Sequence, residues 1–179
     1  MAAHLALSVI GDDKRGILAA VSKVLFDTGC NIQDSSMTLV RGEFAMLMVL
    51  AAPEDTSPET LREAIVSQVA DVTVFIRPVA QQQPASPLPK GKEFVVSVYG
   101  GDRPGIVHRV SRALAEMGVN ITDLKTKVIG DPERPVYVMV LEVDIPAELE
   151  PEDVETELKT VAAKLSVNVT VRPLESRAL

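Results

Sequence analysis

The chain has 179 residues and a formal net charge of −7 at pH 7, and 46% of its residues are hydrophobic while only 3% are aromatic. This length accommodates two domains of ordinary size. The acidic charge argues against a surface that neutralises nucleic-acid phosphates. One cysteine, Cys30, is too few for an internal disulfide or a cysteine-based zinc site, so we expect no metal and no disulfide.

The N-terminus opens with a short apolar run, Leu5–Ile10, which has no basic residues before it and breaks at Gly11. A signal peptide carries basic residues ahead of its apolar core, and a membrane span needs about 20 apolar residues. The run therefore predicts a strand. We expect no membrane association and a cytoplasmic location.

The first half predicts a strand, a helix, two strands, a helix and a strand. Apolar residues at helical spacing define the first helix, which ends before Gly29. Arg41 and Gly42 form the tight turn between the two central strands, and Ser57 followed by Pro58 is typical of a helix start. The predicted ranges are 5–10, 17–28, 32–40, 44–51, 58–69 and 72–76.

The second half repeats this order, and from Gly11 to Asp34 its matching residues lie 89 positions further along the chain. The repeated residues are mainly glycines, turn residues and core aliphatics, with no nucleophile–base pair among them. The predicted ranges are 94–99, 106–117, 119–129, 136–143, 154–165 and 167–171, with a longer hairpin at 130–135.

Each half thus has the β-α-β-β-α-β order of a ferredoxin-like unit. We predict an α+β protein in which each unit is a four-stranded antiparallel sheet with two helices on one face. The segment between the halves is rich in glutamine and proline and predicts a linker. The predicted boundaries are 1–78 for the first domain, 79–91 for the linker, 92–173 for the second domain and 174–179 for a tail.

The turn before the first helix of each half is the strongest candidate for a binding site. The two turns contain Asp13 with Gly16, and Asp102 with Gly105. A helix N-terminus presents unpaired N–H groups and the positive end of a dipole, which suit a carboxylate or a phosphate. The aspartates would then pair with a cationic group such as an α-ammonium. The alternative is that these residues are only turn glycines and helix N-caps.

A second repeated signal follows each first helix, at Asn31 and Asn120. We expect the start of the second strand to lie beside the turn that precedes the helix, so that the asparagine amide and the aspartate would face one ligand. The alternative is a helix stop followed by an Asx turn.

The combined pattern, Gly-x-Asp-x-x-Gly-Ile, then a helix, then Gly-x-Asn-Ile, resembles the ACT domain family of small-molecule regulatory modules. The run 102–106 matches that family closely, whereas the first half has Lys14-Arg15 where Arg-Pro is usual. The resemblance covers nearly the whole chain. It implies amino-acid sensing at an interface between two such units. The ligand-contacting positions that it implies are Asp13, Gly16, Asn31, Asp102, Gly105 and Asn120.

The resemblance favours a non-catalytic regulator that needs no cofactor. A small amino acid, glycine first, would be its ligand, and a homo-oligomer is the expected assembly. Because the chain is acidic and offers no helix-turn-helix outside the two units, any effect on transcription would pass through a protein partner such as a DNA-binding activator. The alternative is a ligand-free assembly subunit of a metabolic enzyme.

We predict that the purified chain binds no DNA by itself, because it has no basic stripe to displace counterions from phosphates. A mobility-shift titration at low salt should give no specific complex. A sequence-specific, salt-dependent shift by the pure protein would contradict this prediction.

Overall fold

The computed structural model describes residues 3–80, 91–131 and 133–174. The chain divides into two compact units, Met1–Ala85 and Ser86–Leu179. Most of the expected linker, 81–90, and most of the expected tail, 175–179, lie outside the described residues, so the domain boundaries stay a prediction.

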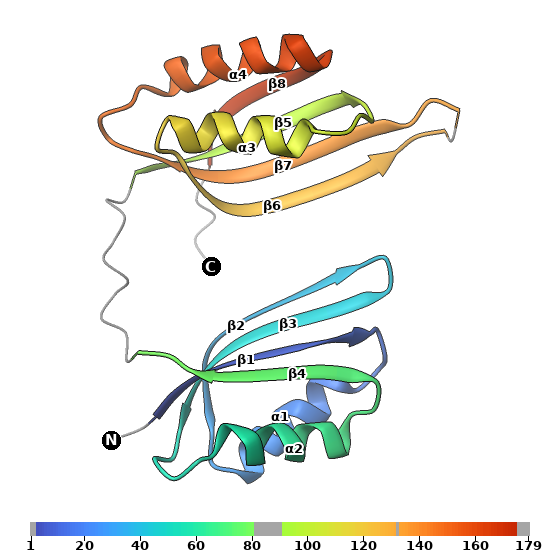
Figure 1. Ribbon diagram of the computed structural model, residues 1–179, viewed down its shortest axis with the longest axis vertical. Coiled ribbons are helices and arrows are strands. Elements are labelled where there is room, and N and C mark those ends of the chain that lie inside the picture. Colours follow the sequence, from blue (N-terminus) through green and yellow to red (C-terminus); the bar gives the residue numbers. More distant parts are fainter. Residues whose placement is uncertain (1–2, 81–90, 132, 175–179) are drawn as a thin grey trace. The chain divides into compact units, whose positions relative to one another are not determined.

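Unit 1 is a four-stranded antiparallel sheet of strand order β2-β3-β1-β4 with both helices on one face (Figure 1). The six elements match the predicted order. Their bounds are β1 (Ala3–Asp12), α1 (Ile17–Asp27), β2 (Asn31–Val40), β3 (Glu43–Ala52), α2 (Pro58–Gln68) and β4 (Val72–Pro78).

Unit 2 repeats this architecture with strand order β6-β7-β5-β8. The ferredoxin-like α+β fold expected for each half is therefore confirmed. The element bounds are β5 (Lys92–Gly101), α3 (Ile106–Glu116), β6 (Asn120–Ile129), β7 (Val136–Ile145), α4 (Pro151–Leu165) and β8 (Val167–Pro173).

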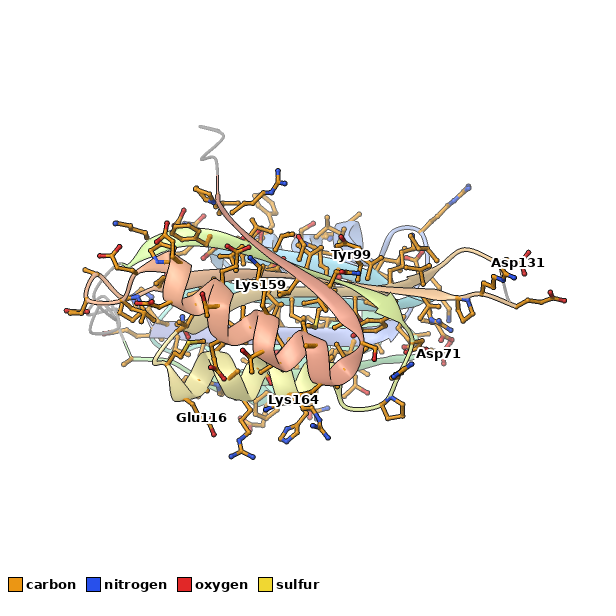
Figure 2. All side chains as sticks on the ribbon, turned by 90° about the horizontal axis from the view of Figure 1, so that it is seen from above. Asp71, Tyr99, Glu116, Asp131, Lys159 and Lys164 are labelled. Carbon is orange, nitrogen blue, oxygen red and sulfur yellow. The ribbon has the colours of Figure 1, made fainter. Side chains whose placement is uncertain are left out.

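The core of each unit lies between the sheet and its two helices. Side chains alternate along a strand, so every second residue of β1 and β3 faces the helices and is buried. In unit 1 these strand residues meet an apolar stripe on α1 and α2. The main contributors are Leu5, Leu7, Val9, Met46, Met48, Leu50, Val21, Leu25, Leu61 and Ile65. Charged side chains such as Glu116 on α3 and Lys159 and Lys164 on α4 lie outside the core (Figure 2).

The repeated glycine at the end of the first strand is required by a close approach. A Cβ on Gly11 would stand 2.5 Å from the carbonyl oxygen of Asp71, and one on Gly100 would stand 2.8 Å from a methyl group of Val167. Any side chain at these positions would push the last strand away from the first. The last strand of each unit can therefore pair with the first strand in this way only when glycine occupies this position.

The second strand of each unit is an edge strand. All ten residues of β2 are exposed, and β3 is its only neighbour in the sheet. Met37 and Leu39 pair with Met46 and Phe44, which face the helices, yet the side chains of Met37 and Leu39 are 58% and 57% exposed. The helix layer therefore leaves β2 uncovered, and its free backbone groups and apolar side chains are available to a partner.

Candidate ligand site at the first turn of each unit

The turn between β1 and α1 leaves the start of the helix uncapped by any side chain. Gly16 is the N-cap residue, with a φ of 93°, and no side chain accepts a hydrogen bond from the first turn of α1. The alternative reading of Asp13 as an N-cap is therefore wrong. A left-handed φ of this size is strained for residues other than glycine. The turn thus exposes helix N–H groups with the carboxylate of Asp13 nearby.

The turn of unit 2 has the same geometry. Gly105 precedes α3 with a φ of 92°, and no side chain caps that helix either, so Asp102 is not an N-cap. By contrast, α2 follows the sequence expectation, because the Ser57 hydroxyl accepts a hydrogen bond from the N–H of Thr60 at 3.4 Å. α4 also starts without a side-chain cap, at Glu150, but the two first turns alone combine an uncapped start with a left-handed glycine at the N-cap.

A groove of about 580 Å³ opens beside the turn of unit 1, and we refer to it as groove 1. One wall is the first part of α1, and the other is the second half of β2 with the start of β3. Asp13 and Gly16 both line it, as the sequence predicted for one site. The lining residues are Asp13, Lys14, Gly16, Ile17, Leu18, Ala19, Ser22, Met37, Leu39 and Phe44.

Asn31 lies at the opposite end of the same sheet. It pairs with Ala51, which pairs on its other side with His4, whereas Asp12 shares its row with Glu43 and Val40. The two rows are eight residues apart along β1, or about 27 Å. The expectation that Asn31 would lie beside the turn within one unit is therefore wrong.

Asn120 is displaced in the same way in unit 2. It shares a row with Asp144 and Glu93, while Gly101, just before the turn, pairs with Val136 at the far end. The physical reason is that the second strand runs parallel to the first, since both are antiparallel to the strand between them. Each unit thus brings its aspartate and glycine together and leaves its asparagine distant.

The surroundings of Asn31 contain a contact that sequence spacing did not reveal. The Nδ1 atom of His4 lies 2.9 Å from the side-chain oxygen of Gln33, where the register of β2 shifts between Ile32 and Asp34. This pairing joins β1 to β2 across the intervening β3. His4, which looked isolated in the sequence, thus lies near Asn31 and apart from groove 1.

Lys14, which stands where the family pattern has arginine, forms an ion pair that ties the turn to the rest of unit 1. Its Nζ atom lies 2.6 Å from a carboxylate oxygen of Asp71 in the turn before β4. This hydrogen bond raises the pKa of Lys14 and lowers the pKa of Asp71. Both side chains are exposed, so the pair adds little stability. It does satisfy the lysine charge next to groove 1.

In unit 2 a tyrosine and an arginine take positions beside the turn. Tyr137 pairs with Gly100, as Phe44 pairs with Gly11 in unit 1. Burial raises the pKa of Tyr137, the nearby Asp102 raises it further, and a hydrogen bond with Thr126 opposes both. The Nε atom of Arg109 lies 4.0 Å from where a Cβ on Gly105 would stand. Neither residue stood out in the sequence, because their counterparts in the first half are Phe44 and Ala20.

The described residues offer no sign of a metal site or a membrane-spanning helix. Within 3–80, 91–131 and 133–174, no group of three or more histidine, cysteine, aspartate or glutamate side chains is placed to hold a metal ion. No helix in these ranges is long and apolar enough to cross a membrane. Cys30, with its thiol free, is buried at the end of α1.

Comparison with known families places both units in one class. The ACT domain matches residues 3–77 and again residues 92–172. The chain belongs to the ACT domain family. Its two ACT units account for nearly the whole chain, in agreement with the repeat, the strand order and the two uncapped turns.

Individual relatives include regulators and enzymes that contain similar segments. The chain is 22% identical over 174 residues to the glycine cleavage system transcriptional repressor of Escherichia coli, covering 94% of this chain and 88% of the repressor. It is 33% identical over 118 residues to a bifunctional uridylyltransferase/uridylyl-removing enzyme of Bordetella avium. That match covers 59% of this chain but only 14% of the enzyme.

A solved structure of an unknown protein from Galdieria sulphuraria matches with a TM-score of 0.80 and 25% identity, covering 98% of this chain and all of that chain. The repressor and the Galdieria sulphuraria protein thus both match the chain along nearly its full length. The similarity to the much longer enzyme is confined to a small part of it.

We predict that Tyr137 titrates above the usual phenol value of 10.0, because burial and Asp102 disfavour its ionised form. The chain has two tyrosines, so subtracting the tyrosinate absorbance of Tyr137→Phe from that of the wild type isolates this group. The folded state holds this proton more tightly, so the phenol contributes stability below pH 10 that is lost as pH rises through the folded pKa. A difference titration with its midpoint at or below 10.0 would contradict the prediction.

Proposed function

We propose that this protein is a non-catalytic, amino-acid-responsive regulator in the cytoplasm, similar in role to the glycine cleavage system transcriptional repressor, and that it acts through a DNA-binding protein partner. One observation supports the proposal that the protein binds an amino acid. Each ACT unit has an uncapped helix start beside a free aspartate. The similarity to the Escherichia coli repressor over 94% of this chain supports the regulatory part.

The chemistry of the turn matches the two charges that every free amino acid carries. The helix N–H groups after Gly16 and Gly105 would bind the α-carboxylate. The side chains of Asp13 and Asp102 would pair with the α-ammonium. The two aspartates remain acceptors because neither is used as a helix cap. Glycine is the first ligand to test, since it presents both charges without a side chain.

The asparagines would complete the site from a second ACT unit. When two β2 strands pair antiparallel along their free edges, Asn31 of one copy comes to the Val40 end of the other, beside the first turn. The complete exposure of β2 and its apolar side chains support such pairing. The distance of about 27 Å within a unit would then be a consequence of a site shared between two copies.

A ligand at this interface would act by changing an equilibrium. It can favour one assembly only through different affinities for the free and partner-bound forms. Repression would follow if the ligand-bound form holds a DNA-binding activator inactive. The net charge of −7 disfavours direct contact with DNA.

The second candidate is an assembly subunit of a metabolic enzyme that binds no ligand. The observation that favours it is the exposed apolar edge itself, because Met37, Leu39 and Val40 are each more than half exposed. Such an edge would serve a protein partner equally well with or without an amino acid.

We predict that glycine, or another of the twenty amino acids, raises the melting temperature of the intact chain. At about 100 times its Kd, a ligand stabilises the folded state by roughly 2.7 kcal/mol, a shift of several degrees for units of this size. The pair Asn31→Ala and Asn120→Ala should remove most of the shift, as should Asp13→Asn with Asp102→Asn. Gly105→Val is a poor test, because a φ of 92° strains valine whether or not ligand binds.

Glu63→Gln on the exposed face of α2 is the matched control for a lost carboxylate, and it should leave the shift unchanged. If none of the twenty amino acids moves the melting curve and calorimetry also detects no heat, the sensing role fails. The assembly-only candidate would then take its place.

We also predict that the chain self-associates through β2. Ser36→Lys with Thr38→Lys puts two lysines on this exposed edge strand, and they would meet the lysines of the second copy. Light scattering should show the mass falling to that of a 19.2 kDa monomer, and the ligand-induced shift should be lost with it. Gln68→Lys, which is exposed on α2, controls for added charge. A wild type that is monomeric at every concentration, with or without ligand, would refute the pairing.

A further inference from the structure

The walls of groove 1 are apolar beyond its charged mouth. Leu18 on α1 faces the groove with 47% of its surface exposed, and Met37 and Leu39 on β2 are more exposed still. Phe44 on β3 and Ile17 on α1 lie on the buried side of the groove. The single lysine in the lining, Lys14, is paired with Asp71. Ser22, whose hydroxyl donates to the carbonyl oxygen of Ala19, is the one hydroxyl in the lining. A polar or charged group placed between these walls would therefore lose water contacts and find few partners.

The equivalent positions in unit 2 have different chemistry. Strand registers fix the correspondence: Met37 lies opposite Met46, which pairs with Val9, and Thr126 lies opposite Met139, which pairs with Val98. By the same rows, Leu39 corresponds to Val128 and Phe44 to Tyr137.

On the helix side of the groove, the repeat spacing puts His108 and Arg109 where unit 1 has Ala19 and Ala20. Thr126 and Tyr137 place two hydroxyl groups on the neighbouring strands β6 and β7, in rows two residues apart. Met37, Phe44, Ala19 and Ala20 of unit 1 therefore have hydroxyl or basic counterparts in unit 2, while Leu39 has another apolar residue, Val128, in its place.

From this contrast we infer that groove 1 receives the apolar side chain of an aliphatic amino acid, while the unit 2 site does not. The inference rests on the proposed amino-acid site at the same turn, and adds the class of side chain. The groove volume of about 580 Å³ lies within the range of roughly 300–1,000 Å³ for small-molecule pockets. Glycine would leave the apolar walls in water, whereas leucine, isoleucine or valine would cover them.

Met37 and Phe44 are the residues that set this preference. Their unit 2 counterparts, Thr126 and Tyr137, supply two hydroxyl groups at the same place. The double variant Met37→Thr with Phe44→Tyr transfers this pair into unit 1. Because Tyr137 fits this position in the same fold, the substitution should preserve folding while making the groove polar.

Calorimetry on the intact chain, with leucine and glycine as the probes, tests the inference. Leucine should bind at least tenfold more tightly than glycine, in keeping with the 10–200-fold worth of one methylene group in an apolar pocket. Met37→Thr with Phe44→Tyr should abolish the preference, so that leucine binds this variant no more tightly than glycine does. The reciprocal variant, Thr126→Met with Tyr137→Phe, should add leucine affinity, and Glu63→Gln should change nothing.

The outcomes distinguish a preference for aliphatic side chains from amino-acid binding itself. If glycine binds and leucine binds no more tightly, the side-chain inference is wrong and the amino-acid site stands. If neither binds, the proposed function fails and the inference falls with it. If leucine does not bind and Met37→Thr with Phe44→Tyr lowers the mass seen by light scattering, groove 1 is covered by a second copy, and the inference is overturned.

Discussion

The arrangement of unit 1 depends on its second strand, β2, which pairs with β3 along one edge and is left exposed by the helices. Two helices bury β1 and β3 but leave every residue of β2 exposed. An unpaired edge with apolar side chains is costly in water and is a template for pairing. The same edge forms one wall of groove 1 and carries Asn31 at its far end. Assembly and ligand recognition thus draw on one strand.

The two repeats keep the fold and change the chemistry of the site. Gly11 and Gly100 are fixed by the close approach of the last strand, and Gly16 and Gly105 by a left-handed φ. These demands come from the backbone, so they are equal in both units. The backbone places no such constraint on the residues that face the groove. Phe44 and Tyr137 can therefore differ while their strands stay in the same register.

The sequence predicted the order of all twelve elements, because glycines, helix stops and strand alternation are local signals that appear twice. It also placed Asp13 and Gly16 in one turn, since they are three residues apart, and both line groove 1. It misplaced Asn31 because α1 carries the chain back to the opposite end of the sheet. The Lys14–Asp71 and His4–Gln33 contacts join residues 57 and 29 positions apart. No local pattern encodes such pairs.

One backbone hydrogen bond gives the first turn a mechanical role. The N–H of Asp13 donates to the carbonyl oxygen of Gly42 at 2.8 Å, and Gly42 lies in the hairpin that ends β2. This hydrogen bond therefore joins the loop beside groove 1 to the end of the edge strand β2. A displacement of the loop would pull on the hairpin directly, without a hinge or a long relay through the core. In unit 1, a ligand in groove 1 would therefore affect the position of the β2–β3 hairpin, and with it the edge that pairs with a second copy, through this one hydrogen bond.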